Sequence, residues 1–309
     1  KSLAALQYMT DGGFEYDGEP EGGIYRLLHS VPRLWDTKGA APYGRIDFAT
    51  RADLMPPGDL SQTLVVNFDG FESEQFGTVE AARFVSEAVA RGWRRFIGYN
   101  MRGGPRYVGT NTADGDGRPA DGVHIDLYGR QFGDFMGALL EGADIWCYGQ
   151  GQSHVGMKAD RGSIFVLQDI LNTGLYAAHG GTLSMWDSGS RFAVAGQNRV
   201  HLADGTTLAP GLKSIHFGAP NEYAFEYLMS GGENSLHVVM GLEKPDAKGH
   251  LTVRPRPYAG KFFMSGAAAG RVYVFDPNHG LEPGQVHGNA GEPVTVEEWD
   301  SEVGPFIAA

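Results

Sequence analysis

The sequence contains one cysteine, Cys147, among its 309 residues. A single thiol cannot form a disulfide within the chain, and it cannot supply the set of thiolates that holds an iron–sulfur cluster. No apolar run approaches the roughly eighteen residues that a membrane-spanning helix needs. The opening KSLAALQYMTDGG is too short and too weakly apolar for a signal peptide, although a leader removed before Lys1 stays open. These absences predict a cytoplasmic protein that does not span a membrane.

Basic residues are also scarce. Lysine and arginine number 25 against 37 aspartate and glutamate residues, which gives a formal net charge of −12. This balance argues against nucleic acid and anionic membranes as partners. Hydrophobic residues, at 42%, suffice for a large core, and the 46 glycines are about twice the ordinary usage. Because the glycines lack a collagen period, they indicate a fold with many tight turns.

The chain divides into four predicted segments. The first has no hydrophobic period and is interrupted by glycine and proline, so we expect an extended arm that lies on another surface. The second reads as a strand, a helix and a strand, and the third carries an internal repeat. The segments are an arm at 1–60, an α/β cap at 61–111, a repeat region at 112–280 and a C-terminal tail at 281–309.

The predicted cap has a clear helical signal. TLVVNFDGF (63–71) reads as a buried strand, and FIGYN (96–100) reads as a second one. Between them, Thr78 is a plausible N-cap and Gly92 lies where a C-cap belongs. An apolar stripe at helical spacing connects the two caps, formed by Val79, Ala82, Val85, Val89 and Trp93.

Short strands bounded by glycine recur after residue 121. GVHIDLYG begins at Gly122, and GADIWCYG, GSIFVLQD and GTLSMWDS follow at spacings of 20, 20 and 19 residues. One such unit cannot bury its own apolar face, so stacked units are required. The sequence therefore predicts a mainly β fold, a right-handed parallel β-solenoid with the α/β cap and the N-terminal arm.

Superposition of the repeats at an offset of 20 residues predicts which side chains face inward. The expected interior columns are Val123/Ala143/Ser163, Ile125/Ile145/Phe165 and Leu127/Cys147/Leu167, because they hold nearly all the small and aliphatic side chains. The expected outward columns are His124/Asp144/Ile164, Asp126/Trp146/Val166 and Tyr128/Tyr148/Gln168.

Several segments follow each other in a fixed order: the strand–helix–strand unit, GPRYVGTN, the repeats, SRFAVAG, EYLMSGG and GKFFMSGAAAGRVYVFD. With this set, residues 64–276 resemble a known family, the GXGXG β-helix domain at the C-terminal end of glutamate synthase large subunits. Free-standing archaeal and bacterial versions and a formylmethanofuran dehydrogenase subunit are related to it. The chain departs from the family at Asp169 and Ser188, where a corner glycine is usual, and by insertions at 112–121 and 203–211.

The resemblance implies a non-catalytic assembly subunit of a glutamate-synthase-like complex. Its partners would be a glutaminase-like subunit and an FMN-containing synthase-like subunit, with FMN and iron–sulfur clusters held by those partners. One alternative is the solenoid subunit of a formylmethanofuran-dehydrogenase-like complex. Another, of a different class, is an autonomous carbohydrate-active β-solenoid enzyme, which would need converging exposed carboxylates.

The candidate catalytic and metal-binding residues favour structural roles. His124, His154, His179, His201, His216 and His237 fall on different repeats without metal-ligand spacing. Asp126, Asp144, Asp160 and Asp169 could supply paired carboxylates, but the Asp126 column continues as Trp146 and Val166, which breaks such a cluster. Cys147 is predicted to lie inside, where a thiol acts as a small hydrophobic group. The glycine pairs at 103–104 and 231–232 lack a following helix with a phosphate-binding lysine. We therefore predict no catalytic, cofactor-binding or metal-binding residue in this chain.

The outward aromatic residues suggest a covered surface. Tyr128, Trp146, Tyr148 and Trp186 would form an apolar stripe, which is unusual for a surface that faces only water. We predict that they form a partner interface. The alternative is cover by the chain's own arm, which carries Tyr25, Leu27, Leu28, Leu34 and Trp35.

Overall fold

A computed structural model describes residues 43–71, 79–99, 101, 104–196, 200–201, 205–208, 211–228, 235–246, 248–287 and 294–308. Most of the predicted arm, with Tyr25, Leu27, Leu28, Leu34 and Trp35, lies outside the described residues. The arm's last part differs from the prediction, because strand β1 (Tyr43–Ile46) pairs in parallel with the next strand.

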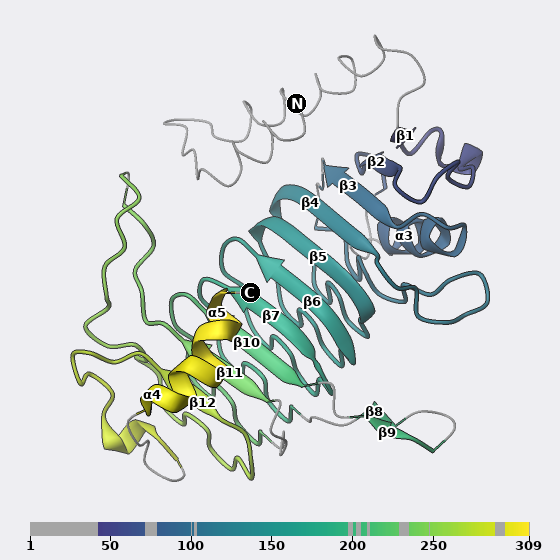
Figure 1. Cartoon of the computed structure of the whole chain (residues 1–309). Coiled ribbons are helices and arrows are strands. Elements are labelled where there is room, and N and C mark those ends of the chain that lie inside the picture. Colours follow the sequence, from purple (N-terminus) through teal and green to yellow (C-terminus); the bar gives the residue numbers. More distant parts are fainter. Residues whose placement is uncertain are drawn as a thin grey trace.

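The fold is mainly β, as predicted, and is built on one open sheet of ten parallel strands that follow each other in sequence order (Figure 1). After β1 come β2 (Thr63–Asn67), β3 (Arg95–Tyr99), β4 (His124–Gln131), β5 (Glu141–Gln150), β6 (Arg161–Val166), β7 (Gly181–Met185), β10 (Leu212–His216), β11 (Leu236–Val239) and β12 (Val272–Val274). A separate antiparallel pair, β8 (Val200–His201) and β9 (Thr207–Leu208), branches out at the predicted insertion.

Helices are few and short among the described residues. Helix α3 (Glu80–Ala90) lies between β2 and β3, where the apolar stripe predicted it. Gly92, with φ of 104°, takes the left-handed conformation that ends the helix, and its N–H donates to the carbonyl of Val89 at 2.9 Å. The other helices are the single turns η1 (Arg51–Asp53) and η2 (Pro283–Gln285), and the consecutive C-terminal turns α4 (Val296–Glu298), η3 (Trp299–Val303) and α5 (Gly304–Ala308).

The strand register confirms the predicted interior for β4 and β5 and corrects it for β6. Ile125 pairs with Ile145, and Cys147 pairs with Leu127, all fully buried. Ile145 then pairs with Ile164, not with Phe165. Ile164 and Val166 are therefore inside, and the prediction that Ser163, Phe165 and Leu167 face the interior is wrong.

A β-bulge in β5 explains the error. Glu141 pairs with Arg161, but Asp144 pairs with Ser163, so β5 contains one more residue than β6 over this stretch. Gly142 lies in the bulge with φ of 110°. Side chains alternate between the two faces of a strand. One extra residue in β5 therefore moves each β6 side chain to the face opposite to the one that a constant 20-residue offset predicts.

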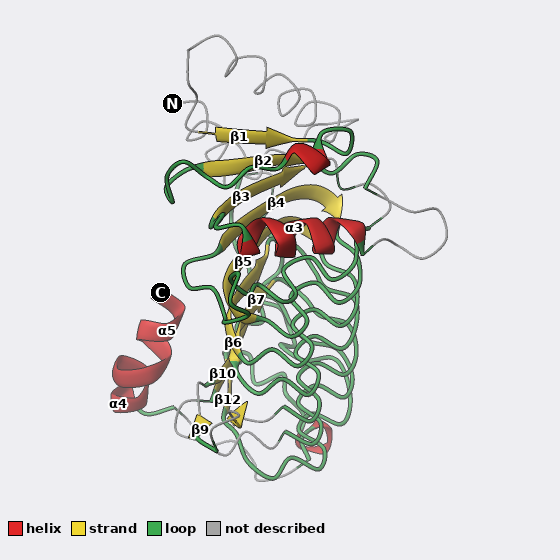
Figure 2. Cartoon of the chain, turned by 90° about the vertical axis from the view of Figure 1, so that its right-hand side faces the viewer, coloured by secondary structure: helices red, strands yellow, loops and turns green. Residues whose placement is uncertain are grey.

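The connections between strands form a second stack beside the sheet (Figure 2). In the connection after β4, three alternate residues have positive φ: Phe135 (62°), Gly137 (62°) and Leu139 (56°). The same alternation recurs in the other connections from β3 to β12, at 107/109/111, 154/156/158, 173/175/177, 191/193/195, 223/225/227 and 262/264/266.

Hydrogen bonds tie each of these turns to both of its neighbours. The N–H groups of Phe135 and Leu139 donate to the following turn, to Ser153 at 2.9 Å and Met157 at 2.8 Å, whereas that of Gly137 donates to Val108 of the preceding turn at 2.9 Å. The alternating conformation points successive N–H groups in opposite directions along the stack. It thereby satisfies backbone groups that a turn inside a folded chain must pair.

Aromatic rings at the first position of these turns stack along the molecule. Tyr107, Phe135 and His154 form one run, with centroid distances of 4.8 and 4.6 Å. Tyr223 and Phe262 begin a second run at 4.8 Å. Such pairs each contribute about 0.5–1.5 kcal/mol beyond their burial, so this ladder helps to hold the turns in register.

The C-terminal turns α4, η3 and α5 cross the outer face of the sheet at β10–β12 (Figure 1). Val303 packs on Leu236 and Val238, together with Phe306 and Ile307. Arg271, directly before β12, pairs with Glu302 of η3. This segment of the predicted tail is therefore part of the folded body and shields the outer face at one end of the sheet.

Candidate functional site

One outward column of the sheet changes from exposed to covered along its length. Strand pairing places Asp126, Trp146, Phe165, Ser184, Ile215, Val238 and Tyr273 at the same register position on successive strands from β4 to β12. Ile215 and Val238 are buried, and Val238 lies beneath the C-terminal segment. Trp146, in contrast, is 38% exposed.

Trp146 and Phe165 form the centre of an open aromatic patch. Their ring centroids are 4.8 Å apart, and Leu167 is exposed two residues further along the chain from Phe165. Tyr128 and Tyr148 stack beside them at 4.5 Å with an interplanar angle of 7°. We call Trp146, Phe165, Tyr128 and Tyr148 the outer aromatic patch.

The structure brings three of the four predicted interface residues together. Tyr128 and Tyr148 are only 4% and 8% exposed, so Trp146 provides most of the accessible aromatic surface. Trp186 instead stacks on Phe217, with centroids 5.8 Å apart. Phe165 was missing from the prediction because the bulge in β5, which moves it outward, leaves no distinct mark in the sequence.

Charged side chains border the patch on β4 and β5. His124 Nε2 lies 3.3 Å from Asp126 Oδ2, and Asp144 accepts a hydrogen bond from Ser163 on β6. The hydrogen bond with Asp126 raises the pKa of His124 above its ordinary value, although partial burial opposes this. Tyr148 Oη is 3.5 Å from Asp126 Oδ1. The patch therefore has an apolar centre and a polar edge, which is the usual composition of a protein interface.

The remaining acidic candidates do not join this group. Asp160 lies 2.7 Å from His179 Nδ1, and Asp169 accepts from Lys244 at 2.7 Å. Each of the four predicted carboxylates thus has its own partner. Among the described residues, no group of three or more histidine, cysteine, aspartate or glutamate side chains is placed to hold a metal ion.

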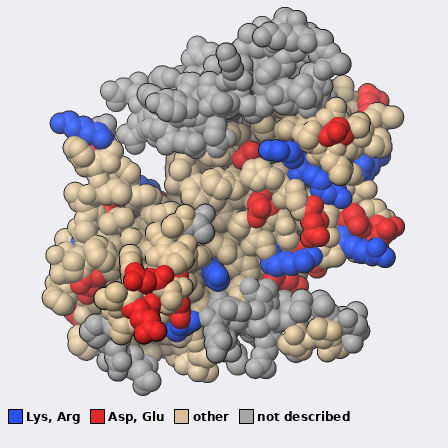
Figure 3. Space-filling model, in the orientation of Figure 1, with Lys and Arg blue, Asp and Glu red and all other residues tan. Residues whose placement is uncertain are grey.

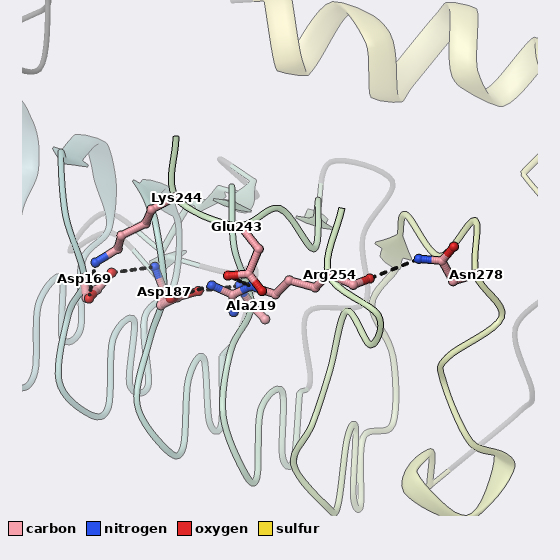
Figure 4. A network of polar contacts seen from close by, with 7 residues as sticks. All are labelled: Asp169, Asp187, Ala219, Glu243, Lys244, Arg254 and Asn278. Carbon is pink, nitrogen blue, oxygen red and sulfur yellow. Dashed lines mark hydrogen bonds and ion pairs between the residues drawn. The ribbon is translucent and has the colours of Figure 1, made fainter. Parts of the chain in front are cut away.

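Asp169 belongs to a polar network that connects successive segments between the strands (Figure 4). Asp187 accepts from the N–H of Ala219 at 2.7 Å and pairs with Arg254 at 2.9 Å. Leu242 and Val253 form an antiparallel bridge, and the chain between them makes a loop. Lys244 lies near the start of this loop, and Arg254 lies directly after its end. The ion pairs of Lys244 with Asp169 and of Arg254 with Asp187 hold this loop against the segments that follow β6 and β7, so their geometry fits a structural role.

Two of the candidate histidines lie in the interior of the fold, a position that no sequence pattern predicted. His216 and His237 are fully buried at inward positions of β10 and β11. Ser188 Oγ is 2.9 Å from His216 Nε2, and Ser214 Oγ is 2.8 Å from His237 Nδ1. Burial lowers the pKa of each imidazole to about 3. A Ser–His pair enclosed in this way cannot reach a substrate.

The other predicted sites also have structural environments. Cys147 is buried beside Met136, with its sulfur 2.9 Å from the thioether, and burial raises the pKa of the thiol well above its ordinary value. The predicted interior position of Cys147 is confirmed. The glycine pairs lie partly or wholly outside the described residues. None of the described helices has the length and apolar character needed to cross a membrane.

Comparison with protein-family models, with curated proteins and with solved structures finds no match to this chain. The resemblance to the GXGXG domain therefore rests on the sequence segments alone.

Proposed function

We propose that the chain is a right-handed β-solenoid that serves as the non-catalytic assembly subunit of a cytoplasmic glutamate-synthase-like complex. The strands from β4 onward would form the solenoid, and α3 with β2 and β3 would be its cap. The right-handed sense follows the strong preference of parallel strand connections. The partners would be a glutaminase-like chain and a synthase-like chain that carries FMN and iron–sulfur clusters.

The turn geometry supports the family part of the proposal. A GXGXG motif places glycine at alternate positions, and glycine is favoured where φ is positive. Alternate positive φ values recur in the turns of this chain, as at Phe135, Gly137 and Leu139. The backbone thus has the alternation that such a motif would require, even where other residues have replaced glycine.

The single observation that carries the assembly role is the open part of the outward column. Trp146 is exposed in the same column that the chain itself covers at Val238. Aromatic residues of this kind are frequent energetic anchors of stable interfaces. A subunit that spaces and braces other chains needs such a surface.

The test is purification of the tagged full-length chain from its native host without denaturant. We expect co-purifying chains with a flavin spectrum and iron, and glutamine-dependent amine transfer by the assembly. The chain produced alone should have no glutaminase, amine-transfer or glycosidase activity. Flavin retained by the isolated chain after stringent washing would contradict the proposal. Partners that carry a metal without flavin would favour the formylmethanofuran-dehydrogenase-like alternative.

A second candidate function has one observation in its favour. Asp126 and Asp144 lie on adjacent strands beside the exposed Trp146, and a carbohydrate-active enzyme combines carboxylates with aromatic platforms. Turnover of a polysaccharide panel by the isolated chain, abolished by Asp126→Asn, would favour this candidate. Activity equal to that of a no-enzyme blank would remove it.

A further inference from the structure

The covered half of the outward column indicates what fits the open half. At β11 the covering element is helical, and its Val303, Phe306 and Ile307 pack on Leu236 and Val238. The spacing of these three residues, i, i+3 and i+4, forms one face of a helix. The column itself runs without interruption to Phe165 and Trp146 through paired strands.

The open half offers the same kind of surface. Trp146 and Phe165 are neighbours across β5 and β6, as Ile215 and Val238 are across β10 and β11. Neighbouring strands are about 4.8 Å apart, so two strands span roughly the width of a helix face. Ser184 of β7, a small side chain, separates the two halves at the same register position.

The charges on this face also separate the two halves. Acidic side chains gather over the C-terminal segment, where α4 and η3 carry Glu297, Glu298, Asp300 and Glu302 (Figure 3). The open half instead carries both signs at its edge, with Asp126 and Asp144 near His124 and Arg95. A partner that binds there contacts an apolar centre and an edge with charges of both signs. Its affinity therefore depends on shape and apolar contact more than on net charge.

We propose that Trp146 and Phe165 bind an amphipathic helix of a partner protein, which lies across β5 and β6 as the chain's own C-terminal segment lies across β10–β12. The helix presents aliphatic or phenylalanine side chains at i, i+3 and i+4 to the two rings. This inference rests on the proposed assembly role and specifies the element that the partner contributes.

The test uses the full-length chain and a defined probe, a fluorescein-labelled amphipathic 15-residue peptide with valine, phenylalanine and isoleucine at i, i+3 and i+4 and lysine on its opposite face. A peptide of identical composition with the apolar positions scrambled controls for attraction to the acidic chain. Fluorescence anisotropy should show binding of the first peptide at least tenfold tighter than that of the second.

Variants locate the peptide on the chain. Trp146→Glu and Phe165→Asp should each weaken binding at least tenfold, whereas Trp299→Ala, on the C-terminal segment, should leave it unchanged. Circular dichroism checks that each variant is folded, and hydrogen exchange of wild-type β5 and β6 with and without peptide gives a second readout. Equal binding of both peptides, or binding that Trp146→Glu leaves intact, would overturn the proposal.

Two further outcomes would assign the patch to another occupant and thereby overturn the proposal. A dimer of the full-length chain in sedimentation that Trp146→Glu dissociates would show that a second copy binds there. Faster hydrogen exchange of residues 1–42 in monomeric Trp146→Glu would show that the chain covers its own patch. A native complex that still assembles with Trp146→Glu would refute this docking mode while leaving the assembly function intact.

Discussion

Polar side chains replace aliphatic ones halfway along an interior column of the sheet. The column begins with Ile125, Ile145, Ile164 and Leu183 and continues with Ser214 and His237 before Val272. Ser214 and His237 are both fully buried, and the hydrogen bond between them meets part of the cost of their burial. A second buried pair of this kind lies in the next inward column, where His216 is hydrogen-bonded to the hydroxyl of Ser188.

These histidines should make the fold sensitive to mild acid. Their pKa is about 3 in the folded chain and near 6.5 when unfolded, so protons bind preferentially to the unfolded state. Stability is therefore fully present above pH 6.5 and is lost progressively as the pH falls towards 3. At pH 5 each histidine should lower the free energy of unfolding by about 2 kcal/mol. Urea titrations at pH 7.5 and 5.0 measure this.

A double variant isolates the effect. Ser214→Ala with His237→Leu removes the titrating ring and its partner together, so about half of the difference between the two pH values should disappear. The exposed His250→Leu serves as the control and should preserve the full difference. An unchanged pH dependence in the double variant would show that other groups cause the acid sensitivity.

The corrected register makes opposite predictions for neighbouring residues. Ile164 is inside and Phe165 is outside, so Ile164→Ser should lower the free energy of unfolding by about 2–5 kcal/mol and Phe165→Ser by about 1 kcal/mol. In β5, Ile145→Asp should prevent folding, whereas Asp144→Ala should cost little. Urea midpoints of the two β6 variants decide the register, and circular dichroism shows whether the two β5 variants fold. A greater loss for Phe165→Ser than for Ile164→Ser would restore the constant 20-residue offset.

At the scale of the element, the stacked turns use a conformation that ordinary residues disfavour. A left-handed backbone costs an L-residue with a Cβ roughly 1–2 kcal/mol relative to the right-handed form. Leu139, Ala177 and Ala195 nevertheless occupy the third position of their turns with φ of 56°, 49° and 54°. Hydrogen bonds to both neighbouring turns must offset this cost.

Glycine should therefore be tolerated better in these turns than elsewhere on the surface. Leu139→Gly relieves the left-handed backbone, whereas Leu171→Gly, at another exposed leucine that lacks positive φ, only adds freedom to the unfolded chain. Thermal or urea unfolding should show Leu139→Gly more stable than Leu171→Gly by about 1–2 kcal/mol. Equal losses at both sites would mean that the turn conformation is not under strain.

The elements differ in how far their sequence determines them. The β4 and β5 strands and α3 were predictable because their apolar residues recur at the period of the element. The bulge at Gly142 was not predictable, since a glycine at that position is equally compatible with an ordinary turn before the strand. The turn triples were hidden because most of their members are not glycine. Buried His216 and His237 resembled exposed histidines, because hydrogen bonding to serine requires the folded coils.

The same limits apply to the candidate site. Trp146 was predictable as an outward aromatic residue from its alternation with Ile145 and Cys147. Phe165 depended on the register after the bulge. The contact of Val303 with Leu236 and Val238 was not predictable. The apolar pattern of the C-terminal segment is too short to indicate which part of the chain it packs against.

At the scale of the whole molecule, each described strand of the large sheet pairs with the strand before it and the strand after it in that sheet. The ten strands pair in chain order, so the sheet has two ends and every internal strand is stabilised from both sides. Stability in such a linear array is a sum of nearest-neighbour contributions, and the ends open first. The C-terminal segment counteracts this at one end, because it packs on the outer face of the last strands.

Removal of that cover should loosen one end of the sheet alone. Val303 is 2% exposed against Leu236 and Val238, so Val303→Asp should place a carboxylate in this contact and release the segment. Burial of one such side chain is worth roughly 1.5–3 kcal/mol, so amides of β11 and β12 should exchange at least tenfold faster. Val296→Asp, at a position that is 76% exposed, should leave exchange unchanged. Exchange that rises equally in β4 and β5 would show that the sheet opens as one unit and that its two ends are not independent.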